Sequence, residues 1–185
     1  MLRQRNDQLA NDFRDFIKCL DNNDVLFVLV GGYAVGWHGV VRATGDIDFL
    51  YERTEDNVER LCAAMRAFGA PENLIDPDFM LLSDAVTQIG HAPLRIDLLA
   101  GISGVSFADV RAGAVEAELS GSSMLVIGLN ELRTNKAATG RQRDKDDLRR
   151  LARGVTPADQ SSARLRTKGV TANAGKRQPR RGGKE

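Results

Sequence analysis

The chain of 185 residues is 42% apolar and 28% charged, with a net charge of +1. These values are typical of a folded domain with room for an extension, and they exclude a largely disordered chain. No apolar run is long enough to span a bilayer, and residues 1–12 contain no apolar signal-peptide segment. The two cysteines, Cys19 and Cys62, have no metal-binding spacing. We therefore expect free thiols and a cytoplasmic protein without a membrane partner.

Charge is distributed unevenly along the chain. Residues 154–185 contain eight Lys or Arg and two acids, a local balance of +6, so residues 1–153 carry −5. The tail has few large apolar side chains, and such a composition cannot offset the entropy lost on ordering. We predict one domain at 1–153 and a basic, disordered tail at 154–185. Two roles stay open for the tail: contact with RNA or DNA phosphates, or a solvated extension.

The N-terminal half alternates helices with strands. An apolar run at 25–30 without polar alternation predicts a strand that is covered on both faces. A later helix should end at Gly69, because glycine favours the left-handed cap and Pro71 follows it. The predicted elements are a helix at 6–20, a strand at 25–30, a short helix at 33–38, a strand at 46–52 and a helix at 58–68.

The strands predicted in the C-terminal half favour more antiparallel pairing. Its predicted elements are strands at 79–82, 85–89, 94–99, 114–119 and 124–127, then helices at 129–138 and 144–151. Together the two halves favour an α/β (α+β) domain with a mixed, mostly antiparallel sheet flanked by helices.

Three aspartates lie on strands that are otherwise apolar. Asp46 and Asp48 flank Ile47, so on a strand both should face the same side. Asp97 lies inside a second apolar run at 94–99. Buried carboxylates tend to be paired or to bind metals, and Mg²⁺ prefers oxygen ligands. We interpret Asp46, Asp48 and Asp97 as one metal site.

Gly31 and Gly32 end the first strand and lead into the short helix that follows. Glycine lets a phosphate approach the backbone closely, and free N–H groups at a helix start attract anions. A turn that needs positive φ is the competing interpretation for such a pair. The P-loop and the dinucleotide-binding glycine patterns are absent. The aspartates on the next strand favour the phosphate interpretation.

These residues together resemble the nucleotidyltransferase superfamily that includes DNA polymerase beta, and most closely its small bacterial branch of abortive-infection-type toxins. A later segment resembles the Lys-x-x-x-Gly-Arg-x-x-Asp element of that branch. The matching positions are Gly31, Gly32, Asp46, Asp48, Asp97, Lys136, Gly140, Arg141 and Asp144.

The resemblance implies a minimal nucleotidyltransferase fold and a metal-dependent transfer of a nucleoside monophosphate from a nucleoside triphosphate, such as ATP, to a hydroxyl acceptor. Asp46, Asp48 and Asp97 would be catalytic and would hold two Mg²⁺ ions. Gly31 and Gly32 would cradle the triphosphate. The acceptor would be tRNA or other RNA, protein or a small molecule, and an antitoxin or another partner protein is a further implied possibility.

For several charged and polar residues near these motifs, the sequence leaves more than one role possible. Within the resemblance, Lys136 and Arg141 would neutralise triphosphate charge, or else be solvated helix residues. Asp144 is either part of that element or a helix cap. Arg42 and Thr44 are close enough to Asp46 to orient it or to contact a phosphate, and Thr44 suits a turn equally. Arg95 is expected on the face opposite Asp97, outside the site. Trp37 is expected to pack, and His38 is undecided.

The leading hypothesis is therefore a metal-dependent nucleotidyltransferase. The alternative is a non-catalytic nucleotide- or RNA-binding module that uses the basic tail, and its RNA binding would be sensitive to salt. A third possibility is an enzyme that is active only with a partner protein.

Overall fold

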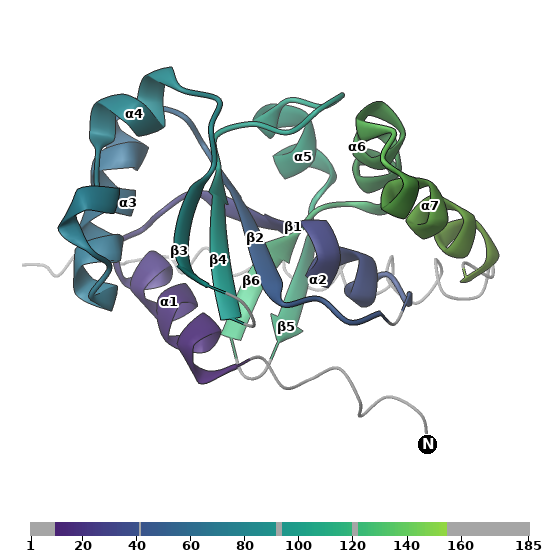
Figure 1. Cartoon of the computed structure of the whole chain (residues 1–185), viewed down its shortest axis with the longest axis horizontal. Coiled ribbons are helices and arrows are strands. Elements are labelled where there is room, and N and C mark those ends of the chain that lie inside the picture. Colours follow the sequence, from purple (N-terminus) through teal and green to yellow (C-terminus); the bar gives the residue numbers. More distant parts are fainter. Residues whose placement is uncertain (1–9, 41, 92–93, 120–121, 155–185) are drawn as a thin grey trace, which may run out of the picture. The chain divides into compact units, whose positions relative to one another are not determined.

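The computed structural model describes residues 10–40, 42–91, 94–119 and 122–154, and Figure 1 shows their arrangement. The predicted basic tail lies outside the described residues. The described part forms one compact unit.

Seven α-helices, one 3-10 helix and six strands make up the described chain. In order they are α1 (Asn11–Asn22), β1 (Phe27–Val30), α2 (Gly31–Trp37), β2 (Asp46–Tyr51), α3 (Glu55–Phe68), η1 (Glu72–Leu74), α4 (Pro77–Leu82), β3 (Thr87–His91), β4 (Leu94–Leu99), α5 (Phe107–Gly113), β5 (Val115–Leu119), β6 (Ser122–Val126), α6 (Leu129–Thr139) and α7 (Gln142–Gly154).

The six strands form a single sheet in the order β3-β4-β2-β1-β6-β5. β2 runs parallel to β4, and β1 runs parallel to β6. The other three pairs, β1 with β2, β3 with β4 and β5 with β6, are antiparallel. The prediction of a mixed, mostly antiparallel sheet is therefore confirmed.

The two faces of the sheet have different neighbours. On one face, the Phe49 ring of β2 lies 5.9 Å from Phe16 of α1, and Phe16 lies 5.1 Å from Phe68 of α3. The Tyr51 hydroxyl of the same face donates to the Met80 carbonyl of α4. Because side chains alternate along β2, Asp46 and Asp48 project from the other face. In Figure 1, α1, α3 and α4 gather on one side of the sheet and α5, α6 and α7 on the other.

One local prediction was wrong, and one helix was missed. Residues 79–82 were expected to form a strand, but they belong to helix α4. Pro77 opens that helix and the Asp76 side chain accepts a hydrogen bond from the Phe79 N–H, so a capped start outweighs the apolar run. Helix α5 was not predicted, although Ser106 and Asp109 form a capping box at its start.

Other boundaries are close to expectation. Helix α3 ends at Gly69, whose φ of 87° is the expected left-handed cap. The glycine pair itself forms the first turn of α2, earlier than the predicted start at residue 33. Cys19 and Cys62 are both free thiols. Among the described helices, none has the length and apolar character needed to cross a membrane.

Candidate active site

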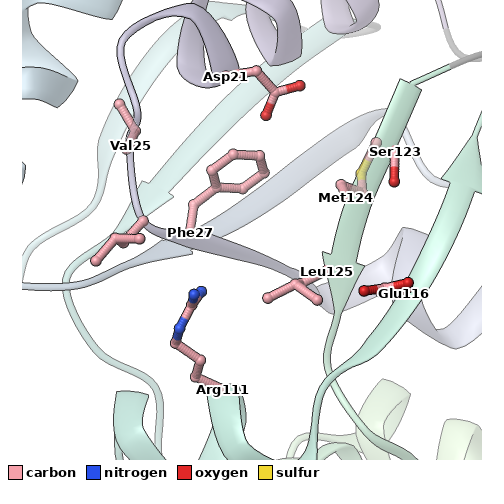
Figure 2. A pocket seen from close by; sticks show the side chains of 9 residues that line it. Asp21, Val25, Phe27, Arg111, Glu116, Ser123, Met124 and Leu125 are labelled. Atoms are coloured by element: carbon pink, nitrogen blue, oxygen red, sulfur yellow. The ribbon is translucent and has the colours of Figure 1, made fainter. Parts of the chain in front are cut away.

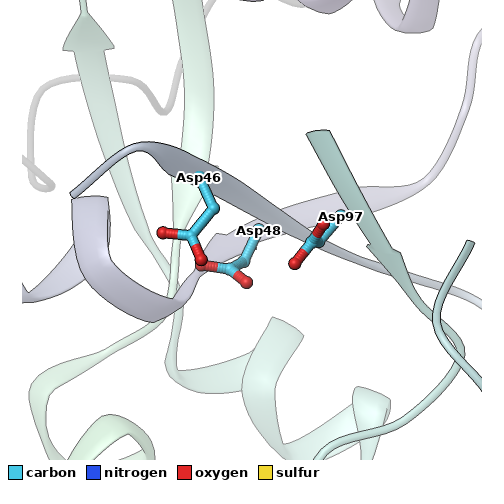
Figure 3. A group of neighbouring side chains, drawn as sticks. All are labelled: Asp46, Asp48 and Asp97. Carbon is cyan, nitrogen blue, oxygen red and sulfur yellow. The ribbon is translucent and has the colours of Figure 1, made fainter. Parts of the chain in front are cut away.

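Asp46, Asp48 and Asp97 converge on one face of the sheet. Asp48 of β2 lies directly opposite Asp97 in the parallel pairing with β4, and Asp46 precedes Asp48 by two residues on the same face. One carboxylate oxygen from each residue lies within 4.8 Å of the other two. Figure 3 shows the Asp46 and Asp48 carboxylates side by side, with Asp97 approaching from the neighbouring strand. The predicted trio of acids is thus one cluster in space.

The three carboxylates have different surroundings. Burial, together with the charges of Asp46 and Asp97, raises the pKa of Asp48 from 3.8 to about 6. Asp46 behaves differently. Burial alone would raise its pKa, but the Thr44 hydrogen bond and the nearby charges of Arg95 and Arg143 lower it below 3.8. Two neighbouring acids with pKa values shifted in opposite directions are typical of functional sites.

Arg95 lies inside this cluster, so its predicted exclusion from the site was wrong. Its Nε donates to Oδ1 of Asp97 at 2.7 Å, and its Nη2 donates to Oδ2 of Asp97 at 2.8 Å. The same Nη2 lies 3.1 Å from Oδ2 of Asp46. Residues 95 and 97 are two apart on β4, and such residues share a face of a strand. The alternation that placed Asp46 beside Asp48 would also have placed Arg95 beside Asp97.

The glycine pair is required by the side chains that pack against it. Gly31 has a φ of 64°, and a Cβ there would lie only 2.0 Å from Oδ2 of Asp48. A Cβ on Gly32 would lie 2.6 Å from the Thr44 hydroxyl. The Gly32 N–H donates to Oδ2 of Asp48 at 3.4 Å. The turn interpretation therefore holds for Gly31, and the pair also lets the acid of β2 reach the backbone of α2.

Arg42 and Thr44 both lie beside the glycine pair, on the segment that leads into β2. The Thr44 hydroxyl donates to Oδ1 of Asp46 at 2.5 Å, a contact that fixes the direction of that carboxylate. Arg42 Nη2 would lie 3.1 Å from a Cβ on Gly32. Its Nε lies 3.1 Å from Oδ1 of Asp147 on α7. Within the described part of the chain, the buried Nε and Nη1 of Arg42 have no hydrogen-bond partner of good geometry.

Lys136 belongs to a buried ion-pair network between α6 and α7. Its Nζ donates to Oδ1 of Asp144 at 2.6 Å and lies 3.3 Å from Oδ2 of Asp147. The second oxygen of Asp144 accepts a hydrogen bond from the Thr139 hydroxyl. The Asp144 carboxylate therefore joins the two helices instead of capping α7. Lys136 is also close enough to Asp48 for its charge to oppose the rise of that residue's pKa.

The remaining predicted residues lie at the edge of this region. Arg141 is exposed in the turn between α6 and α7, where its charge helps to lower the pKa of Asp144. Trp37 was expected to pack, but 41% of its surface is exposed. His38 has a structural contact: its Nε2 lies 2.8 Å from the Ile127 carbonyl, so this nitrogen carries the proton. Burial lowers the pKa of His38.

A divalent cation fits the cluster. The donors are three carboxylates, the ligands that Mg²⁺ prefers, and they come from rigid neighbouring strands. Burial raises the pKa of Asp48, and the negative charges of Asp46 and Asp97 raise it further, as expected for carboxylates that repel one another. A divalent cation between the three carboxylates would relieve that repulsion, which the Arg95 guanidinium offsets in part at Asp46 and Asp97. Asp46, Asp48 and Asp97 are the residues that would hold a metal.

A separate hollow lies at the opposite end of β1. It has a volume of about 290 Å³ and is lined by Asp21, Val25, Leu26, Phe27, Arg111, Glu116, Ser123, Met124 and Leu125 (Figure 2). Since Asp48 pairs with Val30 at the far end of β1, this hollow is remote from the carboxylates. It contains none of the predicted site residues.

The chain has the fold of solved nucleotidyltransferases. Within this fold the acid pair lies on β2, the third acid on β4 and the glycine pair in the first turn of α2. The lincosamide antibiotic adenylyltransferase LnuA, in its lincomycin-bound form, superposes with a TM-score of 0.54 at 13% identity, covering 81% of this chain and 100% of that one. The antibiotic-resistance factor ANT(2'')-Ia gives a TM-score of 0.53 at 10% identity, over 85% of this chain and 89% of that one.

A protein from Thermotoga maritima that is described as a nucleotidyltransferase gives a TM-score of 0.50 at 15% identity, over 77% of this chain and 91% of that one. No family model matches the sequence. A search of curated proteins also finds no match. At these identities the likeness establishes the fold, and the predicted minimal nucleotidyltransferase fold is confirmed. The abortive-infection branch stays a prediction.

Proposed function

We propose that this chain is a metal-dependent nucleotidyltransferase, which moves a nucleoside monophosphate from a nucleoside triphosphate to a hydroxyl group of an acceptor. The observation that carries the proposal is the convergence of Asp46, Asp48 and Asp97 beside the Gly31-Gly32 turn of a nucleotidyltransferase fold. Three partly or fully buried acids whose carboxylate oxygens lie within 4.8 Å of one another carry a repulsion that a bound cation would offset, and this supports a metal-dependent activity.

In this proposal Asp46 and Asp48 hold Mg²⁺, with Asp97 completing the ligand set. When bound, two such ions would neutralise charge on the triphosphate and on the attacking and leaving oxygens. The acceptor oxygen forms a bond to the α-phosphorus, the bond from that phosphorus to the bridging oxygen breaks, and pyrophosphate leaves. Asp97 accepts the proton of the acceptor hydroxyl on a carboxylate oxygen. Its position on β4, opposite Asp48, supports this role.

Nucleotide binding is assigned to Gly31, Gly32, Arg42, Thr44, Lys136 and Arg141. Arg42 supports this assignment best, since its buried guanidinium lies against Gly32 with two nitrogens that lack well-aligned partners in the described chain. Arg141 is exposed and can reach a ligand. Lys136 already pairs with Asp144 and Asp147. While those ion pairs persist, Lys136 attracts the triphosphate through its charge without a direct hydrogen bond to it.

For the acceptor we favour a small molecule, with ATP as the donor. LnuA is named as an antibiotic adenylyltransferase, and ANT(2'')-Ia is named as an antibiotic-resistance factor. The hypotheses of an RNA acceptor, a toxin–antitoxin role and a partner protein have no support in the described residues. The tail-based binding module stays an untested alternative, because the tail lies outside the described residues.

A transfer assay tests the proposal. The purified chain is incubated with Mg²⁺ and each of the four α-labelled triphosphates, in the presence of cell extract, cell RNA or a panel of hydroxyl-bearing antibiotics. We expect label to move to one acceptor class and the double variant Asp46→Ala, Asp48→Ala to abolish that transfer. The matched control is Asp12→Ala, Asp15→Ala, which removes two exposed acids from α1. Full transfer by the β2 double variant would refute the proposed function.

A further inference from the structure

Arg95 is bound to the same carboxylate oxygens that a divalent cation would need. Its fork engages both oxygens of Asp97, at 2.7 and 2.8 Å, and its Nη2 also reaches Oδ2 of Asp46 at 3.1 Å. Gln88 of β3 adds a further contact to Oδ1 of Asp97 at 3.3 Å. Two of the three acids are thus tied together by one guanidinium.

The position of Arg95 follows from the register of the sheet. Residue 95 lies opposite Asp46 in the β2–β4 pairing, just as Asp97 lies opposite Asp48. All four side chains therefore project from the same face of the sheet, where Arg95 lies beside Asp46 and Asp97 lies beside Asp48. Arg95 is the one cation that contacts the carboxylates of the acid cluster in the described part of the chain. Its side chain is 33% exposed, so it has space to move toward solvent.

The contact between Arg95 and the carboxylates should lower the affinity of the site for a divalent cation. Mg²⁺ binds carboxylate oxygens at about 2.0–2.1 Å. A guanidinium already held by the same oxygens would then lie within a few ångströms of the ion, and two positive charges at that separation repel strongly in a partly buried site. Carboxylate oxygens that accept hydrogen bonds from a guanidinium are also weaker metal ligands, because their lone pairs are shared with the N–H groups.

We propose that Arg95 is an internal counter-ion that holds Asp46 and Asp97 in place without metal and is displaced when a divalent cation binds. This inference rests on the proposed function, because it assigns Arg95 a positioning role at the same metal site. Because its positive charge pairs with Asp46 and Asp97, Arg95 stabilises the metal-free acid cluster. The same charge repels a divalent cation and so lowers metal affinity. Binding of metal is thereby coupled to movement of the Arg95 side chain away from the carboxylates.

The test measures metal binding directly, without nucleotide or acceptor. Titration calorimetry with Mg²⁺, and paramagnetic resonance with Mn²⁺, compare the wild-type chain with Arg95→Gln. We expect the variant to bind metal roughly five- to fiftyfold more tightly, since one repelling charge is gone. The metal-free variant should melt at a lower temperature than the wild type. Saturating metal should raise its melting temperature more than that of the wild type.

Two further variants make the result specific. Arg95→Lys keeps the charge but not the fork, so its metal affinity should lie between those of the wild type and Arg95→Gln. Arg66→Gln is the matched control, because Arg66 also donates through Nε and Nη2 to a carboxylate, that of Glu72, away from the cluster. It should leave metal affinity unchanged.

Each result is decisive. Unchanged or weaker metal binding by Arg95→Gln, alongside normal binding by the wild type, overturns the counter-ion role and leaves the proposed function intact. Should Arg95→Gln fail to fold, Arg95→Lys carries the test: affinity no higher than that of the wild type overturns the role. Metal binding by Arg95→Gln but not by the wild type supports the counter-ion role. Absence of metal binding by both chains overturns that role, and the proposed function is then decided by the transfer assay with nucleotide.

Discussion

Asp48 and Asp97 lie opposite each other in the parallel pairing of β2 with β4. Two acids at facing positions of neighbouring strands repel one another, and burial strengthens the effect. The site therefore carries an electrostatic cost in the metal-free protein. That cost falls mainly on Asp48, whose pKa is raised to about 6.

Neutralising Asp48 should stabilise the metal-free protein. Because its pKa rises from 3.8 to about 6 on folding, the folded state binds the proton more tightly than the unfolded state. The resulting stabilisation is complete below about pH 4 and is lost as the pH rises through 6. Asp48→Asn should thus raise the free energy of unfolding by roughly 1–3 kcal/mol at pH 8, with little gain at pH 4. Urea denaturation in the presence of a chelator measures both values.

The control for Asp48→Asn is Glu118→Gln, which removes an exposed acid from the edge strand β5. We expect it to change stability by less than about 0.5 kcal/mol at either pH. A destabilised Asp48→Asn, or one whose gain is the same at both pH values, would contradict the assigned pKa.

Gly31→Ala should be strongly destabilising. The new Cβ would lie 2.0 Å from Oδ2 of Asp48, and the residue would keep a φ of 64°. Because the new side chain is overpacked and its backbone is left-handed, we expect the free energy of unfolding to fall by roughly 2–4 kcal/mol. Gly39→Ala is the control, since Gly39 has a φ of 95° but no neighbouring atom within 4 Å of an added Cβ. Equal losses in the two variants would show that the contact with Asp48 is unimportant.

Asp147 should be more important for stability than its neighbour Asp146. Asp147 is buried between Arg42 and Lys136, and its removal leaves two buried cations with one remaining acid partner, Asp144. We expect Asp147→Ala to cost roughly 3–5 kcal/mol in thermal or urea unfolding. Asp146→Ala, on the same helix, breaks only exposed contacts with Arg149 and Gln142 and should cost less than about 1 kcal/mol. Similar costs would mean that the network does not hold α7 in place.

Thr44→Val should weaken metal binding. The Thr44 hydroxyl donates to Oδ1 of Asp46 at 2.5 Å and helps to lower the pKa of that acid. Valine has nearly the same shape but no donor, so Asp46 would lose the bond that orients its carboxylate. That bond uses Oδ1 and does not occupy Oδ2, the oxygen that Arg95 contacts. We expect a roughly two- to tenfold lower affinity for Mg²⁺ by calorimetry, equivalent to one hydrogen bond to a charged group. Thr44→Ser keeps the hydroxyl and should bind as the wild type does. A Thr44→Val variant with normal affinity would leave Thr44 only its turn role.

Prediction from sequence worked best where a pattern is local. The period of two along β2 placed Asp46 and Asp48 on one face, and the buried run at 94–99 identified the strand of Asp97. Prediction from sequence failed where two local signals in the chain favoured different structures. The apolar residues at 79–82 resembled a strand, yet the Asp76-Pro77 start made them a helix. Arg95 was misplaced although the period of two already contained the right answer.

The sequence alone determined which strands carry acids, where a glycine pair follows a strand and which superfamily the motifs resemble, because these features depend on neighbours a few residues apart. Only the tertiary structure decided that β4 pairs in parallel with β2, and hence that Asp97 faces Asp48 while Arg95 faces Asp46. It alone also brought Arg42 to Asp147 and Lys136 to Asp144. Such contacts depend on how distant segments pack together, and no local spacing in the chain encodes that packing.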